Sequence, residues 1–133
     1  MSLATILLIA AGQPMVVIDE KATLRREPPP HGEIGMSSAY RISDAVPQPR
    51  EMEFRRRDLD VGAAIGEHPI GHDEVYYVLS GDGEAVSDGK RAKVTAGMAA
   101  YFYKNAVVGI WQRGEKPLSL IIAYPVAPEP KKD

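Results

Sequence analysis

A chain of 133 residues has the size of one ordinary domain and is long enough to bury a hydrophobic core. Its formal net charge is only −2 and its basic residues form no long stripe, which argues against nucleic-acid binding. The absence of cysteine excludes disulfides and thiol chemistry, and 11 prolines with 12 glycines favour many turns over long helices.

The chain begins with an apolar run over residues 3–11 that is too short to span a bilayer. The run fits the hydrophobic region of a signal peptide, although no Lys or Arg precedes it. A buried first strand fits it equally well, so an exported and a cytoplasmic protein both stay open. We treat residues 1–14 as a separate N-terminal segment, either a signal remnant or an edge strand.

The remaining sequence predicts one all-β domain over residues 15–125 and a proline-rich, charged tail over residues 126–133. No stretch carries a 3.6-residue apolar stripe over three turns, so little helix is expected. Short alternating segments lie 8 to 12 residues apart with Gly- and Asp-containing turns between them, which indicates a sandwich or barrel. The expected strands are 15–19, 36–42, 51–59, 63–67, 75–80, 84–87, 91–95, 99–103, 107–112 and 118–124.

The segment 62–83, GAAIGEHPIGHDEVYYVLSGDG, carries two of the three histidines, directly before a strand-like run. Histidine and carboxylate side chains on one strand can point into one pocket, as in the metal and substrate sites of small barrels. The segment resembles the first conserved motif of the cupin superfamily, and the resemblance extends over residues 62–124. The residues that satisfy the motif's spacing are Gly62, His68, Glu74 and Gly81.

The resemblance implies a jelly-roll β-barrel (a double-stranded β-helix) that is usually dimeric. The expected partner is therefore a second copy of the chain, with the N-terminal strands covering a sheet edge of the neighbour. A small-molecule ligand is the other expected partner, and neither nucleic acid nor a membrane span is expected.

The family's usual metal site consists of three histidines and one glutamate. By the resemblance, His68 and Glu74 occupy two of these places, while Ile70 and Val108 occupy the other two. Aliphatic side chains have no lone pair to donate, and two ligands alone should hold a metal weakly. His72 would join Glu74 on one face only if the strand already began at His72.

Two functions remain open at this stage. The favoured one is a non-catalytic small-molecule-binding module with a degenerate metal site and no cofactor. The alternative is a metal-dependent isomerase or oxygenase acting on a small polar substrate, with a divalent metal held by His68, Glu74 and His72; a structural dimer subunit is a weaker third. The candidate ligand-binding residues are His68, Glu74, Tyr76, Tyr103 and Gln112.

Each candidate also has a purely structural interpretation. His68 can hydrogen-bond a backbone carbonyl, and Glu74 can pair with a lysine or arginine. His72 fits a solvated loop, and His31, which follows the proline run, is expected on the surface.

Overall fold

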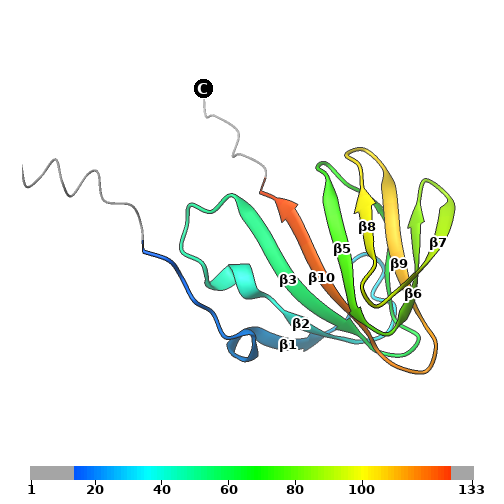
Figure 1. Ribbon diagram of the computed structural model, residues 1–133, viewed down its shortest axis with the longest axis horizontal. Coiled ribbons are helices and arrows are strands. Elements are labelled where there is room, and N and C mark those ends of the chain that lie inside the picture. The colour runs from blue at the N-terminus through cyan, green and yellow to red at the C-terminus, as the bar shows by residue number, and fades with distance from the viewer. Residues whose placement is uncertain (1–13, 127–133) are drawn as a thin grey trace, which may run out of the picture.

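Two antiparallel β-sheets make up the computed structural model, which describes residues 14–126 (Figure 1). The larger sheet has the strand order β1-β2-β3-β10-β5-β8, and the smaller has the order β4-β9-β6-β7. The strands are β1 (Leu24–Glu27), β2 (Ser37–Tyr40), β3 (Met52–Leu59), β4 (Ala64–Pro69), β5 (Glu74–Ser80), β6 (Asp82–Ser87), β7 (Lys90–Thr95), β8 (Ala99–Phe102), β9 (Val107–Arg113) and β10 (Leu118–Pro125). The predicted all-β jelly roll is confirmed.

The core forms where alternating apolar side chains of the two sheets meet. In β10, Leu118, Leu120 and Ile122 are buried on one face, as a strand period of two requires. The smaller sheet contributes Val108 and Ile110 from β9 to the same cluster. Removal of this apolar surface from water is the main favourable term in the folding of such a domain.

The register of the larger sheet puts inward-facing side chains of four strands in one row at one end of the barrel. Glu53 pairs with Tyr124, Ala123 pairs with Val75, and Glu74 pairs with Phe102. Side chains directly opposite each other on paired strands are about 5 Å apart at Cβ. The row across β3, β10, β5 and β8 is therefore Glu53, Tyr124, Glu74 and Phe102.

The N-terminal part differs from the prediction. Residues 15–19 are irregular rather than a strand, because Asp19 accepts a hydrogen bond from the Lys21 amide and starts a 3-10 helix, η1 (Glu20–Thr23). The strand β1 was not predicted, since its sequence LRRE has no apolar alternation. A second 3-10 helix, η2 (Ile42–Ala45), begins where the predicted strand 36–42 was to end.

The other predicted strands are present, with ends shifted by a few residues. The apolar run 3–11 and most of the tail lie outside the described residues, so neither expectation about the first segment is decided. Within residues 14–126, no helix has the length and hydropathy needed to cross a lipid bilayer.

Candidate ligand-binding site

Glu74 begins β5 and points its carboxyl group into the barrel. Its residue is only 6% exposed, and it lies in the row beside Phe102, which belongs to the apolar core. Its Oε2 atom is fully buried and has no hydrogen-bond partner among residues 14–126. Burial raises the pKa of Glu74 to about 7, because the apolar surroundings disfavour the charged form. This carboxyl group can therefore gain or lose a proton near neutral pH.

Tyr124 and His72 lie beside Glu74. The rings of His72 and Tyr124 are stacked, with centroids 4.5 Å apart and an interplanar angle of 11°. Burial raises the pKa of Tyr124; the Arg55 charge opposes this shift, and the carboxylates of Glu53 and Glu74 add to it. Because β5 begins only at Glu74, the strand does not carry His72; the preceding loop places its ring against Tyr124 instead of in open solvent.

Tyr76 follows Glu74 on the same face of β5 and forms part of the same wall. It is almost fully buried and meets Phe102 edge-to-face, with ring centroids 5.0 Å apart. Burial, together with the nearby Glu74 carboxylate, raises the pKa of Tyr76. The phenol therefore stays protonated and can serve only as a neutral hydrogen-bonding group.

His68 comes from the other sheet, on β4, where it pairs with Val108 of β9. Its Nδ1 lies 2.8 Å from the carbonyl oxygen of Gly66, and its ring stacks on that of His31 with centroids 3.5 Å apart. A Cβ at Gly66 would lie 2.0 Å from the carbonyl oxygen of His31, so only glycine allows this loop to pack against β4. The structural interpretation of His68, a hydrogen bond with a backbone carbonyl, is confirmed.

His31 is exposed, as expected for a residue after the proline run, but it is packed against another ring. Burial and the neighbouring charge of His68 lower its pKa, because both disfavour the imidazolium form. The β1–β2 loop is therefore held to β4 by a pair of stacked imidazoles.

The residues present do not fit the metal site of three histidines and one glutamate. Ile70 and Val108, at two of the ligand places, are buried members of the hydrophobic core. Among residues 14–126, no three His, Asp or Glu side chains are grouped closely enough to hold a metal ion. His68, His72 and Glu74 thus do not form the expected three-ligand set.

Two of the predicted ligand-binding residues lie elsewhere. Gln112 is at the opposite end of the barrel, where its amide accepts a hydrogen bond from the Gly62 amide (2.8 Å). Its Nε2 amino group, which has two hydrogens to donate, lies within hydrogen-bond distance of three carbonyl oxygens, those of Arg113 (2.8 Å), Gly114 (3.0 Å) and Lys116 (2.7 Å). These contacts fasten backbone turns around the buried side chain and give Gln112 a structural role at this end of the barrel; its part in ligand binding stays a prediction.

Tyr103 is the second of these two residues. It is 72% exposed and contacts Tyr101, because Phe102 points into the core and a strand alternates its faces. The prediction missed Tyr124, although the alternation of apolar residues in 118–124 already places position 124 on the inward face. It also missed Phe102, whose strand carries too short an apolar pattern to fix which face is inward.

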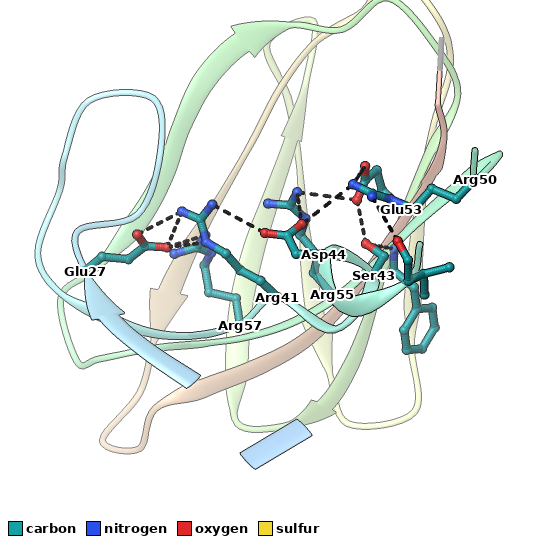
Figure 2. Close-up of polar contacts among 10 residues, drawn as sticks. Glu27, Arg41, Ser43, Asp44, Arg50, Glu53, Arg55 and Arg57 are labelled. Atoms are coloured by element: carbon teal, nitrogen blue, oxygen red, sulfur yellow. Dashed lines mark hydrogen bonds and ion pairs between the residues drawn. The ribbon is translucent and has the colours of Figure 1, made fainter. Parts of the chain in front are cut away.

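A set of paired charges lines the inner side of β3 and its N-terminal neighbours (Figure 2). We call it the polar wall; its residues are Glu27, Arg41, Asp44, Arg50, Glu53, Arg55 and Arg57. Arg41 holds Glu27 through two contacts of 2.8 and 2.9 Å, and Arg50 holds Glu53 at 2.9 Å. Burial favours a higher pKa for Glu53, but hydrogen bonds from Ser43 and Arg50 and the Arg55 charge outweigh it and lower the pKa.

Comparison with known proteins supports the fold. The crystal structure of a predicted oxalate decarboxylase from Thermotoga maritima is 24% identical, with a TM-score of 0.73 over 85% of this chain and 100% of that chain. A putative sugar phosphate isomerase from Acidithiobacillus ferrooxidans is 19% identical, with a TM-score of 0.70 over 85% and 75% of the two chains. The polyketide cyclase RemF from Streptomyces resistomycificus is 13% identical, with a TM-score of 0.70 over 84% and 80%. At such identities the similarity shows the fold alone.

No curated protein matches this chain significantly. The family model described as the Cupin domain matches residues 55–124, which include β4, β5, β9 and Glu74. With two facing antiparallel sheets and a motif that starts at Gly62, the chain belongs to the cupin superfamily.

Proposed function

We propose that this protein is a cupin that binds a small polar molecule, without a metal of the usual cupin type, at the end of the barrel where Glu74, Tyr76 and Tyr124 lie. The observation that carries the proposal is the buried Oε2 atom of Glu74, which has no hydrogen-bond partner within residues 14–126. Unsatisfied buried polar atoms are rare in folded proteins and call for an explanation.

A ligand that donates a hydrogen bond to Oε2 would remove the cost of leaving this atom unpaired. Leaving a buried acceptor unpaired costs about 1–3 kcal/mol, so a ligand hydroxyl or amine that reaches Oε2 recovers part of that free energy. Phe102 and Tyr76 supply apolar and aromatic surface beside the carboxyl group, and Tyr124 adds a phenol. A few polar groups on a largely apolar wall are typical of small-ligand sites.

The pKa of Glu74 also supports a second candidate, an isomerase. A carboxyl group with a pKa of about 7 is well matched to proton transfer at neutral pH, as a general acid or base. In this candidate Glu74 takes a proton from one carbon of a small polar substrate and returns it to another. Of the two reactions expected from the sequence, only isomerisation draws support from a group that the chain itself supplies.

A ligand screen tests the proposal. The unaltered protein is heated with small carboxylic acids and sugars at pH 6 and pH 8.5, and Tm is recorded. We expect at least one compound to raise Tm, and Glu74→Gln to abolish the rise. The matched control is Glu115→Gln, an exposed glutamate near the other end of the barrel, which should keep it. A compound that stabilises Glu74→Gln as much as the unaltered protein would contradict the proposed site.

Elemental analysis separates this proposal from the metal-dependent alternative. We expect far less than one first-row metal ion per chain in protein purified without added metal. One metal per chain, lost on His68→Ala, would show that the metal-free proposal is wrong. Conversion of a hit compound by the unaltered protein but not by Glu74→Gln would favour the isomerase over the binding module.

A further inference from the structure

The polar wall carries more positive than negative charge. Four of its members are arginines, whereas only three, Glu27, Asp44 and Glu53, are carboxylates. The arginines are largely removed from solvent, since 7% of the Arg57 side chain and 24% of the Arg55 side chain are exposed. A buried charge without a full partner is costly, so a bound anion would stabilise this side of the barrel.

Arg55, in the middle of the polar wall, has hydrogen-bond donors to spare. It contacts Asp44 and Glu53 through Nη2 alone, at 3.2 and 3.4 Å (Figure 2). Its Nε atom is buried and has no hydrogen-bond partner among residues 14–126, and its Nη1 atom makes no hydrogen bond to those residues either. Of the five N–H groups of a guanidinium, those on Nε and Nη1 are therefore unused within the described chain.

The register of the larger sheet puts Arg55 one row away from Glu74. Arg55 of β3 pairs with Ile122 of β10, and Ile122 pairs with Tyr76 of β5, two residues after Glu74. Adjacent strands lie about 4.8 Å apart, so the backbones of β3 and β5 are about 10 Å apart, and the long arginine side chain can span part of that distance. Tyr124 stands between the two groups: apart from burial, which has the largest effect, Arg55 and Glu74 shift the pKa of its phenol in opposite directions.

The cavity at this end of the barrel limits the size of the ligand. It has a volume of about 240 Å³, and its lining includes Glu74 and Tyr124. Pockets for drug-sized molecules measure about 300–1,000 Å³, so this one suits a molecule of a few carbon atoms.

An oxyanion and a hydroxyl group together match the unused groups on the two sides of Tyr124. A carboxylate or phosphate oxygen accepts from a guanidinium, and such charge-assisted hydrogen bonds are about twice as strong as neutral ones. A hydroxyl can donate to the Oε2 atom of Glu74, which has no partner among residues 14–126. A cationic ligand fits less well, because the excess positive charge of the polar wall repels it.

We propose that the ligand of this site is a small hydroxylated anion, a hydroxy acid or a hydroxylated phosphate ester, whose oxyanion binds Arg55 and whose hydroxyl donates to Glu74. This inference rests on the proposed function, because it names the chemical class bound at the same site. It gives the polar wall a second task beside the attachment of β1, since Arg55 makes no contact with Glu27 of that strand within the described chain.

Matched compounds test the two contacts separately. The full chain is heated at pH 7 with glycerol, propionate, glycerate and glycerol 3-phosphate, and with glucose, hexanoate, gluconate and glucose 6-phosphate. A compound with both an oxyanion and a hydroxyl should raise Tm more than its counterparts with only one of them, and the carboxylate and phosphate members show which oxyanion is preferred.

Titration calorimetry with the best compound then tests Arg55. Arg55→Gln should raise Kd about tenfold or more, because a charge-assisted hydrogen bond is lost. The matched control is Arg113→Gln, which removes an arginine that contacts Glu84 at the same distance of 3.2 Å on the smaller sheet, and it should leave Kd unchanged.

Three results would overturn the inference. Neutral compounds that stabilise as much as their anionic counterparts, with the effect lost in Glu74→Gln, would reject the oxyanion contact and leave the proposed binding site in place. An unchanged Kd in a folded Arg55→Gln would do the same. Stabilisation by none of the compounds rejects the proposed class, and the wider ligand screen then decides on the site itself. If Arg55→Gln does not fold, phenylglyoxal labelling of the unaltered protein decides: the best compound must protect Arg55 and not Arg113, and unchanged labelling of Arg55 rejects the contact.

Discussion

Gln112 at one end of the barrel and Glu74 at the other are both buried polar side chains, and they differ in how completely they are paired. Gln112 is 4% exposed; its carbonyl oxygen accepts from the Gly62 amide, and its amino group shares two hydrogens among the carbonyl oxygens of Arg113, Gly114 and Lys116. Glu74 is 6% exposed, yet its Oε2 atom has no partner within the described residues. At nearly equal burial, Gln112 is hydrogen-bonded to the backbone, whereas Glu74 keeps one carboxyl oxygen without a partner among the described residues.

The polar wall supplies a third case beside these two. Glu53 lies in the same row as Glu74, separated from it only by Tyr124, and is also buried. Its carboxylate is held by Ser43 and Arg50, and its pKa moves down where that of Glu74 moves up. The comparison shows that pairing, and not depth, decides the direction of the shift.

The first prediction concerns the closed end of the barrel. Gln112→Leu leaves the Gly62 amide and three backbone carbonyls without their partner, and we expect a loss of about 3 kcal/mol in the free energy of unfolding. Urea unfolding measures it. The matched control is Gln48→Leu, which removes one exposed contact to the Arg50 amide and should cost well under 1 kcal/mol. Equal losses in the two variants would show that Gln112 does not close this end.

The open end should respond to pH. The pKa of Glu74 is raised in the folded protein, so the folded state binds the proton more tightly than the unfolded state. The stability that this proton binding adds to the folded state is fully present below about pH 4.5 and is lost as pH rises through about 7. The free energy of unfolding changes by about 3 kcal/mol over this range. Glu74→Gln should therefore match the unaltered protein at pH 4.5 and exceed it above pH 7. Parallel Tm–pH curves for the two proteins would show that folding does not raise the pKa of Glu74.

The smallest of the three effects should have the opposite pH dependence. The pKa of Glu53 is lowered in the folded protein, so its contribution is present above its unfolded pKa and is lost as pH falls through the folded one. We expect Glu53→Gln to cost about 2 kcal/mol at pH 7, because Arg50 loses its charged partner, and less in acid. Chemical unfolding at pH 7 and pH 3 measures it. A cost that grows in acid would contradict the pairing described for the polar wall.

Much of the barrel could be predicted because its strands combine period-two burial with clear turns. The run 74–80 and the run 118–124 show this, and Ile70 and Val108, which the resemblance puts at two ligand places, belong to the apolar core. The strand β1 could not be found, since its residues gain stability from charge pairs with distant arginines and not from a local apolar pattern.

The site was only partly predictable for a similar reason. Glu74 was named because it satisfies the spacing of the motif, and Tyr76 because of strand alternation; the structure buries both on one face of β5. Tyr103 lies directly after the short strand β8, and because the preceding Phe102 is buried, strand alternation turns Tyr103 outward. The role of Gln112 depends on where three carbonyls of the following turn point, and spacing along the chain carries no such information.

The polar wall has a consequence for how the first strands are held. β1 buries none of its residues, and Glu27 at its end reaches the remainder of the molecule through Arg41 and Arg57. Dissolved ions weaken such contacts where they are exposed, whereas they leave apolar packing intact or strengthen it. Higher ionic strength should therefore weaken the attachment of β1 while the barrel stays folded. The salt concentration would then control how firmly this N-terminal strand is held.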